Sequence, residues 1–155
     1  MQIDSQVEKV HAEHSYALAE AQLLERYLAQ FVFAYDLSRV PTSESEHSAR
    51  FVPQCGLGRL IQSLEAKVSV PVSLQTRLEA ARRNRNRLAH QYFFDRSDSM
   101  QTCNGRSEMI HELDELGEEF YQLWGYFDEA LVAWLQGELQ TREALLAEFA
   151  RSVCK

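Results

Sequence analysis

Residues that break or cross-link a chain are scarce in this sequence. Its 155 residues include only three prolines and six glycines, so long stretches contain no residue that interrupts a helix. The cysteines are odd in number and widely spaced, and neither a CxxC pair nor a His/Cys cluster with zinc spacing occurs. The sequence therefore excludes a disulfide framework and favours isolated thiols in a reducing compartment: Cys55, Cys103 and Cys154.

Long apolar runs are absent as well. No run approaches the roughly 18 residues that a membrane span requires, and the polar, acidic start does not have the pattern of a signal peptide. With 45% apolar and 25% charged residues, the chain has the size and composition of one globular domain, residues 1–155. We expect a soluble, cytoplasmic protein.

Lysine is the scarce cation, since 13 of the 16 basic residues are arginine. The net charge of −7 argues against a protein that coats nucleic acid, because such a protein is basic overall. The charge is uneven, however. Residues 77–96 contain six arginines and two carboxylates, a net of +4, whereas residues 107–148 contain eleven carboxylates and one arginine, a net of −10. This distribution predicts a local basic cleft on an acidic body, which would bind phosphate at one place and a basic partner elsewhere.

The apolar spacing predicts helices and no strands. Helical periodicity continues from Asp4 to Leu37, and shorter segments fit a second helix from Cys55 to Val68 and a third from Val72 to about Asp95. The segments 38–53 and 96–106 are rich in polar residues and are predicted to be loops.

A fourth helix is predicted from Glu108 to Val153, with Ser107 as its N-cap. Gly125 and Gly137 are candidate points of bending or division within it. Helices joined by short to moderate loops favour an all-α, antiparallel up-and-down bundle of four to five helices.

One polar residue interrupts the apolar stripe of the third helix. The stripe places Arg85 at a position where a heptad pattern requires an apolar side chain; its apolar members are Leu74, Leu78, Ala81, Leu88 and Tyr92. A buried arginine is costly unless it is paired or faces a wet cleft. Two interpretations are open: a structural ion pair with a glutamate of the acidic fourth helix, or a functional cation at a cleft.

Several side chains around this arginine suit phosphate chemistry. His90 follows Arg85 by five residues, about 140° around the helix, and Asn86 shares a face with His90. Arginine binds phosphate oxygens bidentately, and histidine can move a proton near neutral pH. We predict that the neighbouring arginines bind phosphate or RNA: Arg82, Arg83 and Arg87.

The segment from Arg85 to His90, RNRLAH, resembles the R-x4–6-H motif of HEPN domains (higher eukaryotes and prokaryotes nucleotide-binding). Asn86 occupies a position that is commonly Asn, Asp or His in that family. Tyr92 matches the extended form R-x4-H-x-Y, which is seen in HEPN toxins paired with nucleotidyltransferase antitoxins. The resemblance covers this eight-residue motif and the all-α architecture.

The resemblance implies a dimeric helical bundle that acts as a metal-independent ribonuclease. Such an enzyme requires no cofactor and uses a composite cleft between two motif helices, one from each subunit. It implies His90 as general base or acid at the ribose 2′-hydroxyl and the leaving 5′-oxygen. Arg85 would stabilise the phosphorane-like transition state, and Asn86 would orient the phosphate. The expected products are a 2′,3′-cyclic phosphate and a 5′-hydroxyl. The implied partners are a second copy, an RNA substrate and, for a toxin or defence effector, an antitoxin of the nucleotidyltransferase type.

Alternatives stay open for Tyr92 and for the whole chain. Tyr92 is a core aromatic, an element of the site, or a residue that an antitoxin modifies with AMP, and packing is the favoured interpretation. The chain could also be a catalytically inactive HEPN-like module that binds a partner protein or nucleotide, or a plain helical dimerisation protein. Other polar and aromatic residues are predicted to be surface or packing residues: His11, His14, Asp114, Glu115, Glu118, Glu119, Phe120, Trp124, Phe127 and Trp134.

Overall fold

A computed structural model describes residues 5–37, 56–136, 147 and 150–151. Its helices are α1 (Ser5–Leu37), α3 (Leu57–Lys67), α4 (Val72–His90), α5 (Tyr92–Asp95), α6 (Ser97–Met100) and α7 (Cys103–Leu135). Within these ranges there is no strand, so the predicted all-α fold class is confirmed. None of the described helices is both long enough and apolar enough to span a membrane.

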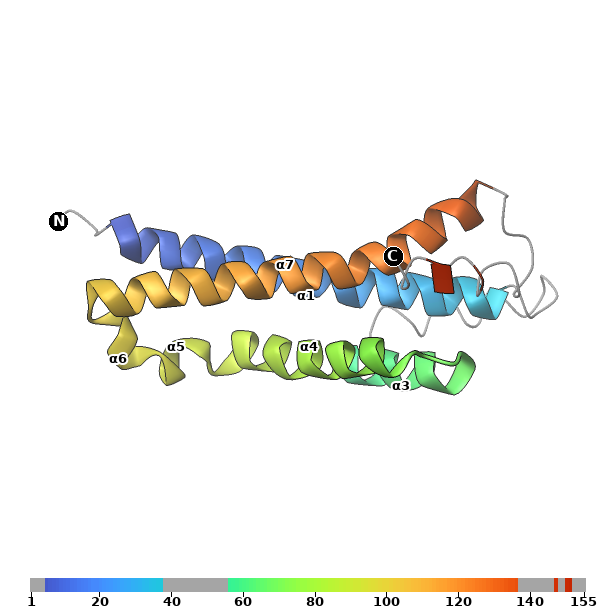
Figure 1. Cartoon of the computed structure of the whole chain (residues 1–155), viewed down its shortest axis with the longest axis horizontal. Coiled ribbons are helices and arrows are strands. Elements are labelled where there is room, and N and C mark those ends of the chain that lie inside the picture. Colours follow the sequence, from blue (N-terminus) through green and yellow to red (C-terminus); the bar gives the residue numbers. More distant parts are fainter. Residues whose placement is uncertain (1–4, 38–55, 137–146, 148–149, 152–155) are drawn as a thin grey trace.

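The long helices α1 and α7 lie side by side and run in the same direction, while α4 runs antiparallel to both (Figure 1). Helix α3 also follows the direction of α1, because Leu57 bonds to Glu25 at its start and Lys67 pairs with Asp36 at its end. The arrangement therefore differs from a strict up-and-down alternation. The segment 38–53, which would make the connection, lies outside the described residues.

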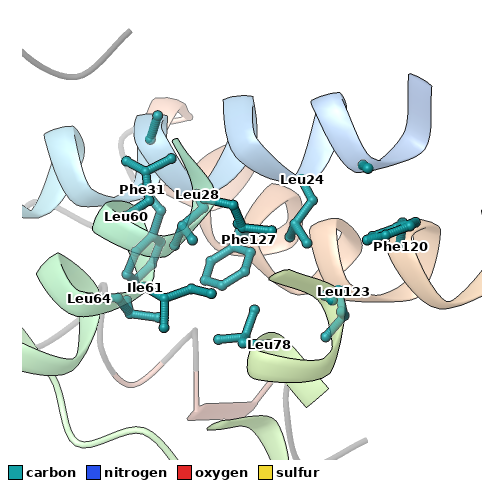
Figure 2. Packing of buried hydrophobic residues seen from close by; sticks show 14 of the residues in the cluster. Leu24, Leu28, Phe31, Leu60, Ile61, Leu64, Leu78, Phe120, Leu123 and Phe127 are labelled. Atoms are coloured by element: carbon teal, nitrogen blue, oxygen red, sulfur yellow. The ribbon is translucent and has the colours of Figure 1, made fainter. Parts of the chain in front are cut away.

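The core lies between the α1/α7 pair and the α3/α4 hairpin. Figure 2 shows how the apolar side chains of four helices meet there: Leu24, Leu28 and Phe31 from α1, Leu60, Ile61 and Leu64 from α3, Leu78 from α4, and Phe120, Leu123 and Phe127 from α7. All of them are at most 5% exposed. This packing stabilises helices of otherwise ordinary propensity, since most helical stability in proteins comes from burying one face.

The third predicted helix divides in two. Gln91 leaves helical geometry at φ −133°, ψ −14°, so α4 ends at His90 and α5 begins at Tyr92. His14 of α1 contacts this break, because its Nε2 lies 2.9 Å from the carbonyl oxygen of Leu88. This contact holds the end of α4 against α1.

The prediction of a loop over 96–106 is wrong. Helix α6 occupies 97–100, and α7 starts at Cys103, so Ser107 lies inside α7 and is not its N-cap. Gly105 permits this tight junction, since a Cβ there would come 2.2 Å from the backbone oxygen of Ser99. The 7% exposed Arg106 donates to the carbonyl oxygen of Met100 and holds the two helices together.

The end of the fourth predicted helix also differs. Helix α7 continues through Gly125 and ends at Leu135, one residue before the turn at Gln136. Residues 147, 150 and 151 are helical, and the rest of the predicted range up to Val153 lies outside the described residues.

Candidate functional site

Two motif side chains stand exposed and uncommitted on the outer face of α4. Asn86 and His90 are four residues apart, so they lie one turn from each other on the same face. Both are exposed, and neither forms a hydrogen bond, ion pair or ring contact with any described residue. An imidazole and an amide are therefore available to a ligand at this face.

Arg85 is half-buried and pairs with a carboxylate of α1. Its Nε lies 2.8 Å from Oε1 of Glu25, and the two side chains are 28% and 19% exposed. The interpretation of a structural ion pair predicted a partner in the acidic fourth helix, and the structure places the partner in α1 instead. The same Glu25 oxygen also accepts a hydrogen bond from the backbone N–H of Leu57, at the start of α3, over 3.3 Å.

The pairing with Glu25 leaves part of the Arg85 guanidinium uncommitted. The buried Nε has no hydrogen bond of good angular geometry, in spite of its short distance to Glu25. Neither Nη group donates to a described residue. These two groups form the fork that binds a phosphate bidentately.

Arg85 and Asn86 border a shallow cavity of about 280 Å³ between α3 and α4. Arg59 and Arg82 also line it, together with Gly56, Leu57 and Gly58 at the start of α3. Gly58 lies close to Arg82, because a Cβ at this glycine would come 3.2 Å from the Cδ of that arginine. Sequence reasoning missed Arg59, whose position near the motif depends on how α3 packs against α4.

Arg82 and Arg83, predicted to bind phosphate, pair with Glu79 within their own helix. Arg82 Nη2 lies 2.6 Å from Oε1 of Glu79, and Arg83 Nη1 lies 3.7 Å from the same oxygen. The hydrogen bond from Arg82 is the main cause of a lowered pKa of Glu79. Arg83 stays 65% exposed, so its contact with Glu79 is a surface pair of small strength.

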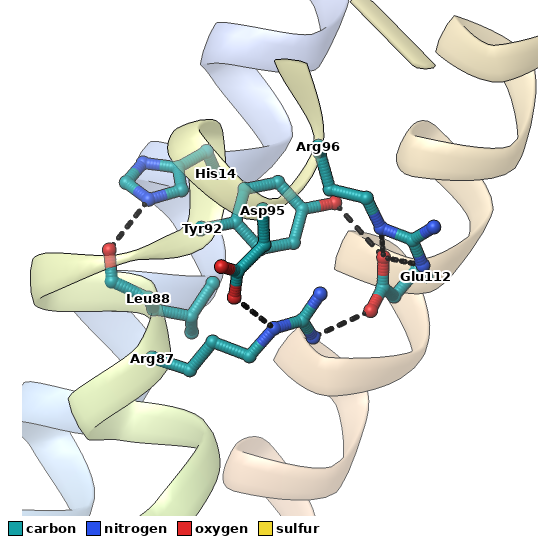
Figure 3. A network of polar contacts seen from close by, with 7 residues as sticks. All are labelled: His14, Arg87, Leu88, Tyr92, Asp95, Arg96 and Glu112. Atoms are coloured by element: carbon teal, nitrogen blue, oxygen red, sulfur yellow. Dashed lines mark hydrogen bonds and ion pairs between the residues drawn. The ribbon is translucent and has the colours of Figure 1, made fainter. Parts of the chain in front are cut away.

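Arg87 belongs to a structural network with α7, shown in Figure 3. Its Nη1 lies 2.7 Å from Glu112, its Nε lies 3.5 Å from Asp95, and its guanidinium stacks 5.0 Å from the ring centre of Tyr92. Arg96 pairs with the same Glu112 carboxylate at 2.7 Å. Burial opposes ionisation of Glu112, but the hydrogen bonds from the two arginines outweigh it and lower the pKa of Glu112.

Tyr92 is 1% exposed and packs in the core beneath this network. Its hydroxyl donates to Glu112 Oε2 over 3.1 Å, and burial together with that carboxylate raises the pKa of Tyr92. These contacts agree with the favoured packing interpretation, since a modifying enzyme could not reach the hydroxyl in this arrangement.

The predicted basic cleft is largely neutralised within the chain. Each arginine between 77 and 96 has a carboxylate partner: Arg77 with Glu119, Arg82 and Arg83 with Glu79, Arg85 with Glu25, and Arg87 and Arg96 with Glu112. Packing of α4 beside α7 brings Glu112 and Glu119 alongside three of these arginines, whereas the other three pair with Glu79 of their own helix or with Glu25 of α1. Counting charges along the chain could not show this pairing.

The remaining candidates fall outside this site. His14 is hydrogen-bonded and not a free surface side chain, and Phe120 and Phe127 are in the core as predicted. Cys103 is an exposed free thiol, whereas Cys55, Cys154 and the side chain of Trp134 are not among the described parts of the chain. The described residues contain no group of three or more His, Cys, Asp or Glu side chains placed to hold a metal ion.

Comparison of the chain with family models, with curated proteins and with solved structures finds no match.

Proposed function

We propose that this chain is a HEPN-type, metal-independent endoribonuclease that acts as a homodimer. The observation that carries the proposal is the pair of uncommitted side chains, Asn86 and His90, on the exposed face of α4 beside Arg85. An imidazole, an amide and a guanidinium fork on the last two turns of one helix are the groups that RNA cleavage by an internal nucleophile requires.

In the proposed reaction the ribose 2′-oxygen attacks the adjacent phosphorus, and the bond from phosphorus to the 5′-oxygen breaks. His90 of one subunit takes the proton of the 2′-hydroxyl, and His90 of the other gives a proton to the leaving 5′-oxygen. The Nη groups of Arg85 stabilise the charge on the equatorial oxygens, and Asn86 holds the phosphate in place. The products are a 2′,3′-cyclic phosphate and a 5′-hydroxyl.

The exposed side chains of this face support a dimer. Phe94, just beyond the motif helix, is 85% exposed, and Val72 at the other end of α4 is 77% exposed. A second copy that packed along the whole length of α4 would cover both of these exposed apolar side chains. Such a dimer would bring two motif helices together in a helical bundle of the HEPN type.

One observation favours a second candidate, a catalytically inactive module that binds a partner protein or nucleotide. The arginines near the motif are paired with carboxylates of the same chain, so the local field available to attract RNA is weak. An inactive module would keep these pairs as structural contacts.

RNA cleavage by the purified full chain separates the two candidates. We expect cleavage of a synthetic RNA in the presence of a chelator, no cleavage of the matching DNA, and products that carry a cyclic phosphate. His90→Ala and Arg85→Ala should each slow cleavage by about 10² or more. His111→Ala is the matched control, because His111 is a 76% exposed histidine on α7 far along the chain from the motif.

Intact RNA after incubation with folded, dimeric wild-type protein would argue for the inactive module. Equal cleavage by the His90 and His111 variants would attribute the activity to a contaminant. In cells, expression of the wild type but not of His90→Ala should arrest growth if the chain is a toxin or defence effector, and co-expression of an antitoxin should relieve the arrest.

A further inference from the structure

The side of the α1/α7 pair that α3 and α4 do not cover carries a row of aromatic and acidic side chains. We call it the acidic–aromatic groove and define it by Tyr16, Glu20 and Tyr27 of α1 and by Tyr121, Trp124 and Asp128 of α7. Tyr16 is 42% exposed and Tyr121 is 49% exposed. These residues recur at helical spacing along both helices, so they form a continuous strip and not scattered surface residues.

Two hollows flank a ring stack at the centre of the groove. Tyr27 and Trp124 stack with centroids 4.9 Å apart and planes 12° apart. A cavity of about 490 Å³ lies on one side, between α1 and α7, and is bordered by Tyr27, Asp128 and Leu131. A cavity of about 380 Å³ lies on the other, bordered by Tyr121, Trp124 and Asp128. The second hollow opens over Gly125, where an added Cβ would meet no atom within 4 Å.

Carboxylates outnumber cations among the described residues of the groove, where Arg26 borders the larger cavity together with Asp128. Asp114, Glu118 and Asp128 form no ion pair with any described residue. Glu20 is only 9% exposed and accepts a 2.6 Å hydrogen bond from the Trp124 indole, without a cation beside it in the described part of the chain. A buried carboxylate without a countercharge is costly, so a cation supplied from outside would be strongly favoured here.

The carboxylates also act together on a neighbouring group. Partial burial, followed by the charges of Glu20, Glu118 and Asp114, raises the pKa of the Tyr16 hydroxyl. The ring of Tyr16 packs over Gly117, where a Cβ would come 2.6 Å from the ring carbon Cε1. The aromatic ring therefore lies against α7 with acidic groups near it, and its 42% exposed side chain can contact a cation from outside.

We infer that the acidic–aromatic groove binds a basic amphipathic helix of another protein. Lysine or arginine side chains of such a helix would pair with Asp114, Glu118 and Asp128 and stack on Tyr121, while a small apolar side chain would enter the hollow over Gly125. From Tyr16 to Ala34, which borders the larger cavity, the strip extends over 19 residues of α1, about 27 Å, which matches a helix of about five turns.

Two other occupants fit the groove less well. A second copy of the chain, docked through the same surface, would place the carboxylates of the two α7 helices against each other, and like charges repel. The chain's own residues 137–155 contain three acidic and three basic residues, so they supply no net countercharge. Charge complementarity thus selects a basic helix, and this inference is independent of the proposed ribonuclease activity.

The test uses a labelled peptide of about 20 residues built from Lys, Leu and Ala, with lysines on both sides of a leucine stripe, and measures its anisotropy with the full chain. A peptide of the same pattern with Glu in place of Lys is the charge control. We expect the lysine peptide to bind with a Kd of about 1–10 µM and the glutamate peptide to show no binding at about 100 µM.

Two triple variants with the same charge change locate the surface. Asp114→Asn, Glu118→Gln and Asp128→Asn together should weaken binding by about tenfold or more, which is about 1.4 kcal/mol or more. The matched set, Asp98→Asn, Glu108→Gln and Glu115→Gln, removes three exposed carboxylates outside the groove and should change binding by less than about twofold. Gly125→Leu, which fills the hollow without changing charge, should also weaken binding.

Three results would overturn the inference. One is the absence of lysine-peptide binding by folded wild-type protein. Another is equal weakening by the two triple variants, which would show binding to the overall acidic charge. The third is a dimer in sedimentation that Gly125→Leu dissociates, which would show that a second copy covers the groove.

Discussion

The substitution Glu25→Gln tests whether the ion pair between Glu25 and Arg85 weakens phosphate binding at the candidate site. The carboxylate occupies the anion position beside the guanidinium, 2.8 Å from Nε, and also accepts the N–H of Leu57. Glutamine keeps the shape and can still accept that N–H, but it removes the charge. The substitution therefore separates the electrostatic role of Glu25 from its role in packing.

The expected loss of stability follows from the geometry. Two unit charges 2.8 Å apart attract by about 6 kcal/mol at an effective dielectric constant of 20, and desolvation offsets most of that attraction. Because the two side chains are 28% and 19% exposed, we expect a net loss of about 1–2 kcal/mol. For a chain of this size, that loss lowers Tm by about 3–6 °C.

Affinity for RNA should change in the opposite direction. For an assumed distance of about 5 Å between the Glu25 carboxylate and a phosphate bound by the Nη groups of Arg85, the repulsion in a water-like medium is about 0.8 kcal/mol. Removing it should tighten binding by about fourfold. The measurement is the anisotropy of a labelled single-stranded RNA, made with Glu25→Gln in a His90→Ala background to prevent cleavage, alongside thermal denaturation.

Glu119→Gln is the matched control. Glu119 of α7 pairs at 2.6 Å with Arg77, which lies on α4 like Arg85, but Glu119 does not line the cavity. It should lower Tm similarly and leave RNA affinity unchanged. If Glu25→Gln fails to tighten RNA binding, or if Glu119→Gln tightens it equally, the cavity beside Arg85 is not where phosphate binds.

Two further predictions concern stability. Gly105→Ala should lower Tm by several degrees, because its Cβ would come 2.2 Å from the Ser99 oxygen. Gly125→Ala should raise the free energy of unfolding by up to about 1 kcal/mol, because no atom lies within 4 Å of the added Cβ. Equal Tm values for the two variants would contradict the packing at the α6–α7 junction. The lowered pKa of Glu112 makes its contribution to stability fully present above the ordinary carboxyl value of 4.5 and progressively lost as the pH falls below it. Glu112→Gln should therefore flatten the acid limb of the stability profile measured by denaturant titration, and an unchanged limb would show that the pairs with Arg87 and Arg96 do not matter.

The sequence predicts those parts of the fold that depend on local pattern. The first helix was expected from Asp4 to Leu37 and is observed from Ser5 to Leu37, because its apolar periodicity is long and contains no proline or glycine. The segment 96–106 has the composition of a loop, yet it forms α6 and the start of α7. What stabilises it is the contact of Arg106 with the Met100 carbonyl and the close approach of Gly105 to Ser99, and neither contact follows from local composition.

The candidate site, like the fold, follows from local sequence pattern only in part. The heptad pattern identifies Arg85 as an arginine at a seam position, and the structure places it there, half-buried and ion-paired. Its partner could not be predicted, because Glu25 comes beside it only through the direction in which α3 and α4 pack on α1. Arg59 joins the cavity for the same reason, since its distance from the motif is set by tertiary packing.

The position of the carboxylates along α7 explains how an acidic chain can carry both surfaces. Glu112 and Glu119 are seven residues apart, so they share the face of α7 that meets α4, and there they pair with arginines. Asp114, Glu118 and Asp128 project from another face and form no ion pair with any described residue, although Arg26 lines the same cavity as Asp128. These unpaired carboxylates therefore lie at the acidic–aromatic groove, away from the face of α7 that meets α4. At physiological salt the field of the groove falls off within about 8 Å, so it would act only weakly on RNA bound at the proposed site on α4. The same separation lets a basic helix bind the groove without competing for the proposed phosphate site.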